Sequence, residues 1–370
     1  ADAGSEIDAA TVFFPIPIAH GIESTPATIF LLLRRHDLRR RRLRVQRGFS
    51  YGVGFGSCLA YHQDSRNAQI LDLVPVSDNL YKDFVPYAPL ADRQLLSISG
   101  DDAVTFAHAQ FSADVAALAD GHWQWSAWLS PKGRTLAVFQ LLRISSGQLL
   151  LVLADGDADE IASQLQRFVF RRKASISVHA ELRVMGGFCA PARASGAVMA
   201  GALPGKDDPA VFLELDVGSA AAPRALRIGA AASPGGEQGD AALTAAWRAS
   251  DLRFGLPRLV AAQREQWTPQ QLGLDRLNGY SVKKGCYPGQ EIVARTHFLG
   301  KAKRAVQLLE LAQPCEPGAP VMQDGRALGT VVSTAGPLAL AVLPLETSEA
   351  PLAVDGQHAR RQPLLDGQAR

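Results

Sequence analysis

Short strand-like segments separated by turn residues dominate the chain from about Phe84 onward, and they constrain its fold more than any other feature. Apolar and polar residues alternate in Leu95–Ser99, as in a half-buried strand. Ser130-Pro131-Lys132-Gly133 is a turn signal between two further strand-like runs, Trp123–Leu129 and Thr135–Ile144. Helical spacing predicts helices in three places: Ala103–Gln110, Ala158–Phe170 and Asp240–Phe254. Because strands and helices alternate irregularly, the sequence predicts an α+β fold rather than a doubly wound parallel sheet.

Three shorter strand-like runs, with Gly and Pro between them, follow Gly300. They are Arg304–Leu311, Leu328–Thr334 and Leu338–Leu343. Short strands spaced in this way predict a small terminal β-barrel.

The first 85 residues differ from the rest of the chain and have no sustained apolar period. A chain of 370 residues is long enough for two or three compact domains. We therefore expect an N-terminal extension at residues 1–85 that can be disordered, a body at 86–299 and a barrel at 300–370. Within the extension, Arg34–Arg47 holds eight arginines, which indicates a solvated basic run or, alternatively, an RNA-binding or targeting arm.

The composition excludes several classes of protein. Lys and Arg number 38 and Asp and Glu 36, a balance that excludes a globally basic nucleic-acid coat. No apolar stretch approaches the roughly 20 residues of a membrane helix, so we expect no membrane segment. Asp2, Glu6 and Asp8 stand where a secretory signal would carry basic residues, which predicts a cytoplasmic protein. The cysteines show no CxxC spacing and predict neither a disulfide framework nor a metal site: Cys58, Cys189, Cys286 and Cys315.

The stretch Ser281–Glu291, of sequence SVKKGCYPGQE, carries the most informative chemistry. Pro288 suits the first turn of a helix, so Cys286 is predicted to lie just before a helix N-terminus with Lys283 and Lys284 beside it. Both features favour a thiolate, and therefore nucleophilic, redox or metal-binding behaviour. The alternative is a buried, inert cysteine in a turn flanked by glycine.

This stretch resembles the K-G-C-Y-x-G-Q-E signature of the YgfZ family, folate-binding proteins linked to iron–sulfur proteins and tRNA modification. Further stretches resemble the family in the same order: Ile98–Ala103, Gln110–Val115, Ser130–Arg134, Asp251–Pro257, Glu291–Arg295 and Lys303–Ala305. The resemblance covers about residues 86–370. It implies the fold of the wider glycine-cleavage T-protein superfamily, an α+β folate-binding body of intertwined subdomains with a terminal β-barrel.

The resemblance also implies which residues function. Cys286 and Lys284 would form the functional centre, and Trp247 corresponds to a folate-contacting tryptophan. A second such tryptophan is replaced here by Arg93, which can stack on a pterin or pair with a carboxylate. The remaining motif residues are Gly285, Tyr287, Gly289, Gln290, Glu291 and Arg295. The last two have the i,i+4 spacing of a helical ion pair.

The implied function is that of an accessory factor rather than an enzyme. Such a factor would bind tetrahydrofolate or a derivative and support iron–sulfur proteins such as tRNA methylthiotransferases. We expect a monomer without a membrane partner, and direct contact with tRNA stays open. The alternative is a folate-dependent aminomethyltransferase of the same superfamily. Leu136–Val138 and Arg253 argue against it, because acidic residues stand at these positions in the transferase pattern.

Overall fold

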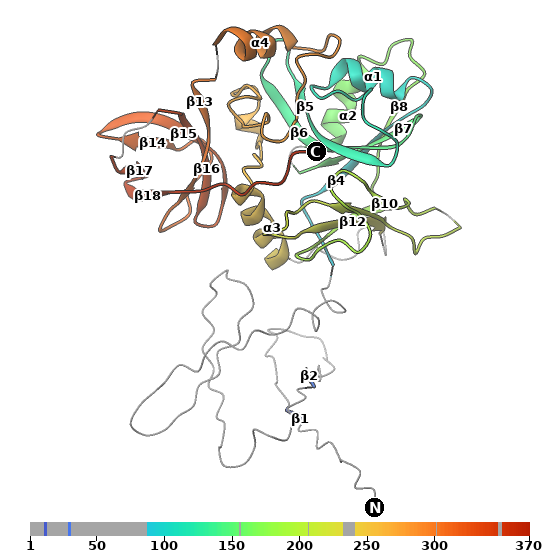
Figure 1. Ribbon diagram of the computed structural model, residues 1–370, viewed down its shortest axis with the longest axis horizontal. Helices are drawn as coiled ribbons and strands as arrows, with labels where there is room; N and C mark the ends of the chain where they lie inside the picture. Colours follow the sequence, from blue (N-terminus) through green and yellow to red (C-terminus); the bar gives the residue numbers. More distant parts are fainter. Residues whose placement is uncertain are drawn as a thin grey trace, which may run out of the picture. The chain divides into compact units, whose positions relative to one another are not determined.

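Two units, Ala1–Asp83 and Phe84–Arg370, make up the chain in the computed structural model. The structure describes residues 11–12, 29–30, 87–154, 157–205, 207–231, 241–300, 302–346 and 350–370. In the first unit, β1 (Thr11–Val12) and β2 (Ile29–Phe30) pair in antiparallel orientation (Figure 1). The basic run Arg34–Arg47 and Cys58 lie outside the described residues.

The first sheet of the second unit has five antiparallel strands in the order β5-β6-β7-β4-β8. Its strands are β4 (Gln94–Ser99), β5 (His122–Leu129), β6 (Thr135–Ser145), β7 (Gln148–Leu153) and β8 (Ser175–Val178). The predicted turn joins β5 to β6, where Gly133 has a φ of 67° and donates its N–H to the Ser130 carbonyl. The strands predicted on either side of this turn are confirmed.

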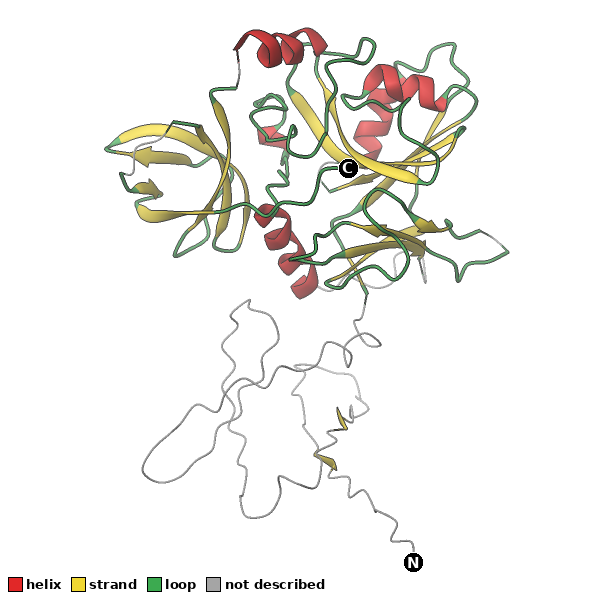
Figure 2. Cartoon of the chain, viewed as in Figure 1, coloured by secondary structure: helices red, strands yellow, loops and turns green. Residues whose placement is uncertain are grey.

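Two helices, α1 (Ala103–Gln110) and α2 (Ala158–Gln166), pack on one face of this sheet (Figure 2). Phe106 of α1 and Ile161 of α2 share a buried apolar cluster with strand residues that include Leu96. α1 has the predicted bounds, whereas α2 ends before the predicted Phe170, whose left-handed backbone (φ 42°) does not belong to an α-helix. Among the described residues, no helix is both long and apolar enough to cross a membrane.

A second antiparallel sheet has the strand order β10-β11-β12-β9-β3. Its strands are β3 (Ala88–Pro89), β9 (Leu182–Gly187), β10 (Ala200–Gly201), β11 (Leu213–Asp216) and β12 (Ala225–Ala230). One apolar core contains side chains of both sheets, for example Trp123 of β5 and Leu226 of β12. Helix α3 (Ala241–Arg253), which lies within its predicted range, adds Trp247 to this core.

A closed barrel of six strands, in the order β13-β16-β15-β14-β17-β18, ends the chain. Its strands are β13 (Arg304–Glu310), β14 (Pro320–Gln323), β15 (Arg326–Ala335), β16 (Leu338–Pro344), β17 (Leu352–Val354) and β18 (Gln357–Gln362). The predicted barrel is confirmed, although β14, β17 and β18 were not predicted. Val306 and Val342 of the barrel belong to the same core as Trp247, so the barrel packs against the body. The Ser333 hydroxyl also accepts from the Arg258 N–H and donates to its carbonyl, each at 2.8 Å.

We predict that a chain beginning at Phe84 folds without the first unit, because the second unit contains its own sheets and apolar cores. The measurement is a thermal melt of the full and the shortened chain, and the two Tm values should agree within a few degrees. Precipitation of the shortened chain, or a melt without cooperativity, would show that the first 83 residues belong to the fold.

Candidate functional site

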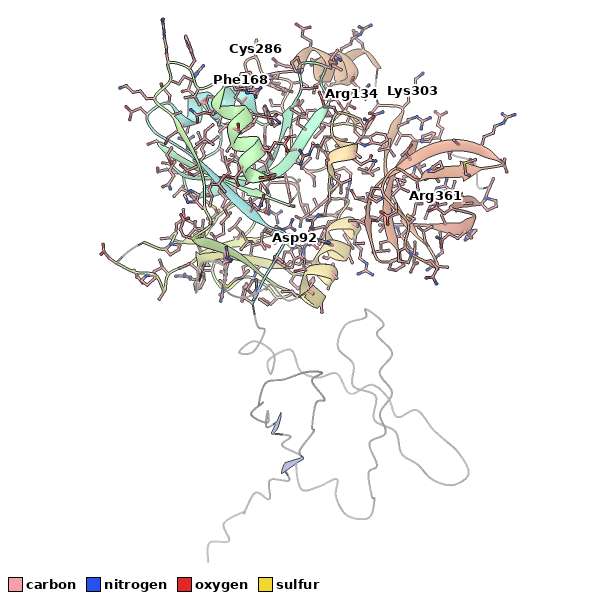
Figure 3. The ribbon with its side chains drawn as sticks, turned by 180° about the vertical axis from the view of Figure 1, so that it is seen from behind. Asp92, Arg134, Phe168, Cys286, Lys303 and Arg361 are labelled. Atoms are coloured by element: carbon pink, nitrogen blue, oxygen red, sulfur yellow. The ribbon has the colours of Figure 1, made fainter. Side chains whose placement is uncertain are left out.

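The segment around Cys286 forms an exposed loop that leads into the short helix α4 (Gln290–Arg295). The loop turns one side chain inward, since Lys284 is only 7% exposed, while Lys283, Gly285 and Cys286 are exposed. Figure 3 shows Cys286 at the outer edge of the second unit. The alternative of a buried cysteine is therefore wrong, because the thiol is open to solvent.

The buried Lys284 ammonium fastens this loop to the end of α1. Its Nζ donates to the carbonyl oxygens of Phe111 at 2.5 Å, Ala113 at 3.2 Å and His108. These carbonyls belong to the last turn of α1 and the residues after it, where helical partners run out. Burial lowers the pKa of Lys284 to about 8, opposed by the nearby Asp114 carboxylate. The ammonium form, which supplies three donors for three acceptors, still dominates at neutral pH.

Further hydrogen bonds within the segment fix the shape of the loop. The Ser281 hydroxyl accepts from the backbone N–H groups of Lys283 and Lys284, both at 3.2 Å. The Gln290 amide donates to the Lys284 carbonyl at 2.9 Å, and the Tyr287 hydroxyl donates to the Ser281 carbonyl at 3.0 Å. Tyr287 is buried, and burial raises the pKa of its phenol. The motif residues Lys284, Tyr287 and Gln290 therefore hold the loop in shape.

Gly289 is required where the loop touches the β5–β6 turn. Its φ of 76° is left-handed, and a Cβ atom there would lie 2.5 Å from the Cα of Gly133. Gly133 is equally constrained, since a Cβ on it would lie 2.7 Å from the Cβ of Ile292 in α4. The two glycines therefore let the predicted turn and the cysteine loop pack backbone against backbone.

His108 lies beside the loop and was not singled out by the sequence. Its Nε2 lies 3.9 Å from the place a Cβ on Gly285 would occupy, and its Nδ1 accepts from the Ala116 N–H at 3.2 Å. Burial and the Lys284 charge lower the pKa of His108, against the opposite effect of Asp114. The imidazole is therefore neutral at physiological pH, with its proton on Nε2 toward the loop. No sequence signal could have found it, because 178 positions of chain separate it from Cys286.

Two other motif residues, Glu291 and Arg295, lie exposed on α4. The ion pair that their spacing predicts is absent, since no ion pair in the described part of the chain joins them. Both residues lie within α4, which continues into a π-helical turn at Thr296–Gly300. Both side chains are therefore open to solvent near Cys286.

The structure brings Trp247 and Arg93 together on the wall of one internal cavity of about 30 Å³. Trp247 is 2% exposed and lies against β9, where a Cβ on Gly186 would come within 2.8 Å of its ring. On its other side the Arg224 guanidinium lies 4.8 Å from the ring centroid. The cavity has room for one or two water molecules.

The carboxylate of Asp251, one helical turn after Trp247, organises the charges around this cavity. Arg93 binds one oxygen of Asp251 at 2.7 Å and Arg224 binds the other at 2.8 Å, while Arg258 approaches to 3.6 Å. Burial raises the pKa of Asp251, but the three guanidinium groups outweigh burial and hold it below its ordinary range. Asp251 is therefore a paired anion. Asp251 was not singled out from the sequence as a site residue. Its charge on the buried face of a predicted helix was the signal that could have identified it.

A larger cleft of about 620 Å³ adjoins the cavity, and Arg258 and Ala154 line both. Asp92 lies in the cleft and binds Arg248 at 2.7 Å and Arg258 at 2.9 Å (Figure 3). Ser333 and Thr334 of the barrel complete one side of it. The cleft therefore lies where the body meets the barrel, and Arg258 stands between it and the internal cavity.

The donor set and the cleft volume fit a folate. The cavity alone is too small for a pterin, but the cleft has the volume of a small-molecule site. Arg248 and Arg258 place two cations against the single carboxylate of Asp92, which leaves positive charge in the cleft for the carboxylates of a glutamate tail. In the described part of the chain three buried N–H groups at the cavity lack an acceptor, and each could donate to a ligand: Arg93 Nε, Arg224 Nε and Trp125 Nε1.

Among the described residues, no three His, Cys, Asp or Glu side chains gather as metal ligands. The three described cysteines are free thiols, with Cys286 exposed, Cys189 partly buried and Cys315 buried.

Comparison with known sequences finds a matching domain family and similar proteins. Residues 303–363 match the model of the CAF17 C-terminal beta-barrel domain. The chain is 31% identical to tRNA-modifying protein YgfZ of Escherichia coli O157:H7 over 229 residues, which are 60% of this chain and 70% of the relative. It is 30% identical to the protein of the same name from Enterobacter sp. strain 638 over 237 residues, again 60% and 70%.

Comparison with solved structures identifies the fold. The glycine cleavage system aminomethyltransferase T from Bartonella henselae superposes with a TM-score of 0.60 over 84% of this chain and 95% of that protein, at 17% sequence identity. At this identity the likeness shows the fold alone. The predicted T-protein-like α+β body with a terminal barrel is confirmed.

Lys284→Met should destabilise the protein by about 1–3 kcal/mol, because the three carbonyl oxygens lose a donor while staying buried. The neighbouring variant Lys283→Met is the matched control, since that side chain is exposed and its loss should change stability by less than about 0.5 kcal/mol. Urea unfolding of both variants measures the difference. Equal stabilities would mean that the ammonium does not anchor the loop.

Proposed function

The chain belongs to the YgfZ family, and on this premise we propose that it is a folate-binding accessory factor that supports tRNA modification in the cytoplasm. The observation that carries the proposal is the exposed Cys286 on a loop that the buried Lys284 holds in place. A thiol kept at the surface by a fixed loop is placed to react with, or bind to, a group that another molecule brings.

Cys286 acts on iron–sulfur proteins in this proposal, for example on tRNA methylthiotransferases. One thiolate cannot hold a cluster alone, because [2Fe–2S] and [4Fe–4S] clusters need about four ligands. Cys286 therefore serves as a transient ligand shared with the client protein, or as a redox-reactive thiol. Lys284 is a positioning residue, since its ammonium contacts backbone carbonyls of the α1 end.

Tetrahydrofolate or a derivative is the proposed ligand of the cavity and the cleft. Arg248 and Arg258 in the cleft would bind its carboxylates, and Trp247 and Arg93 on the wall of the adjoining cavity would contact the part of the ligand that enters from the cleft. The ligand would supply a carried one-carbon group.

The cavity supports an accessory role over aminomethyl transfer. Asp251 is the one carboxylate among the described residues that line it, and three guanidinium groups occupy that carboxylate. Val138, in the stretch Leu136–Val138 that stands where the transferase pattern has an acidic pair, also lines the cavity. The described residues that line the cavity thus include no free carboxylate that could serve as the general base for one-carbon transfer.

We predict that Cys286→Ala folds normally but fails to support tRNA modification. The measurement is the amount of methylthiolated nucleosides in tRNA from cells whose own homologue is deleted and which carry the wild type or the variant. Loss of the exposed thiol should reduce the modification to the level of the deletion strain. Cys315→Ala, which changes a buried thiol in the barrel, is the control and should restore modification in full. Full restoration by Cys286→Ala would reject the assignment.

Trp247→Phe should weaken tetrahydrofolate binding about fivefold, the equivalent of about 1 kcal/mol for a reduced aromatic wall. Phenylalanine keeps the side chain apolar, so the core around β9 should stay folded. Trp128→Phe is the control, since Trp128 is equally buried but belongs to the apolar cluster under α1 and α2. Titration by intrinsic fluorescence measures both. An unchanged affinity of Trp247→Phe would mean that the ligand does not bind at this cavity.

A further inference from the structure

The segment Arg167–Lys173, which follows α2, exposes two phenylalanine rings and four cations. Phe168 is 50% exposed and Phe170 is 84% exposed, whereas Val169 between them is buried in the cluster under α2. Large apolar side chains that lie on the surface beside charged residues indicate an interaction site. The exposed residues of this segment, called the RF surface below, are Arg167, Phe168, Phe170, Arg171, Arg172 and Lys173.

A rigid turn rather than a loose loop holds the RF surface outward. The Phe168 N–H donates to the Leu165 carbonyl and the Arg172 N–H to the Val169 carbonyl, both at 2.9 Å. Phe170 has a φ of 42°, a left-handed backbone that costs a bulky residue energy. A phenylalanine that is strained and also exposed gains nothing from burial. The energetic cost of this backbone conformation therefore indicates that the Phe170 ring has a role outside the folded core.

The cations of the RF surface are open to a partner. Lys173 binds Asp101 at 3.3 Å, with both side chains exposed. In the described part of the chain no ion pair involves Arg167, Arg171 or Arg172. The Arg171 guanidinium lies 5.2 Å from the centroid of the Phe170 ring, so a cation and a ring already stack on one another.

We propose that the RF surface binds a single-stranded stretch of tRNA. Its rings stack on unpaired bases, and its arginines pair with phosphates, the combination by which proteins hold single-stranded RNA. The choice of tRNA as the RNA rests on the proposed function, whereas direct binding goes beyond it. Base-paired RNA does not suit this surface, because its bases are stacked and cannot receive the rings.

The position of the RF surface is compatible with a joint role with the thiol. Phe168 and Cys286 lie toward the same end of the second unit in Figure 3. A tRNA held at the RF surface would thus lie toward the end of the second unit at which Cys286 is exposed.

The first experiment is binding of total tRNA to the full chain over a range of KCl concentrations. The variant Arg171→Gln/Arg172→Gln should bind more weakly, and the slope of log affinity against log salt should flatten by about 1.5, because each phosphate that a cation neutralises contributes about 0.7–0.9 to it. The control with the same charge change, Arg326→Gln/Arg360→Gln on the barrel, should keep the wild-type slope. Equal slopes for the two variants would overturn the proposal.

Phe170→Gly separates binding from stability. Glycine accepts a φ of 42° without strain, so the Tm should not fall, while loss of a stacked ring should weaken tRNA binding about tenfold. Unchanged affinity, or a loss of affinity that a lower Tm accompanies, would contradict the proposal. Binding of the wild type to phosphatidylglycerol vesicles but not to tRNA would assign the surface to a membrane instead. These outcomes are independent of Cys286→Ala, which should bind tRNA like the wild type even where it fails to support modification.

Discussion

The arrangement of the second unit depends on the ion pairs between the buried Asp251 carboxylate and three arginines. The three arginines come from the start of β4, the start of β12 and the segment after α3, so one buried anion joins both sheets and the helix. Through the bonds of Arg258 to Ser333 the same network reaches the barrel. Breaking a buried ion pair leaves an uncompensated charge and costs several kcal/mol, so these segments are held in one relative position. The cavity beside Trp247 adjoins this polar centre, since Asp251, Arg93 and Arg224 all line it.

A second buried charge, the Lys284 ammonium, has the corresponding role at the cysteine loop. Its Nζ donates to backbone carbonyls at the end of α1 that lack helical partners. These hydrogen bonds hold the irregular segment around Cys286 in one conformation. The close approach of Gly289 to Gly133 adds a contact that no larger residue permits. Cys286 is exposed between Lys284 and Tyr287, which are both held inward. Two buried charges thus lie at the internal cavity and beside the loop that carries Cys286, and the apolar cores form the framework between them.

Much of this architecture could be predicted from local sequence. The turn between β5 and β6, the bounds of α1 and the presence of a barrel follow from periodicity and from Gly and Pro, which act over a few residues. β18, with the sequence QHARRQ, has no apolar alternation to reveal it, and β14 and β17 are too short to show a period. The partners of Lys284 and Asp251 could not be predicted, since each bond joins segments that only the tertiary fold brings together. The spacing of Trp247 and Asp251 on one helix was the available signal for the cavity.

In the proposed function, Lys284 acts by holding the loop so that Cys286 is presented in a working position. The most direct test of this role is the amount of methylthiolated nucleosides in tRNA from homologue-deleted cells that carry Lys284→Met, grown at a temperature at which this variant is folded and as abundant as the wild type. Lys303→Met, which changes an exposed cation just before the barrel, is the control. We expect cells with Lys284→Met to lose most of the modification although Cys286 is intact, and cells with Lys303→Met to keep it. Full modification with Lys284→Met would show that Cys286 works without the buried ammonium.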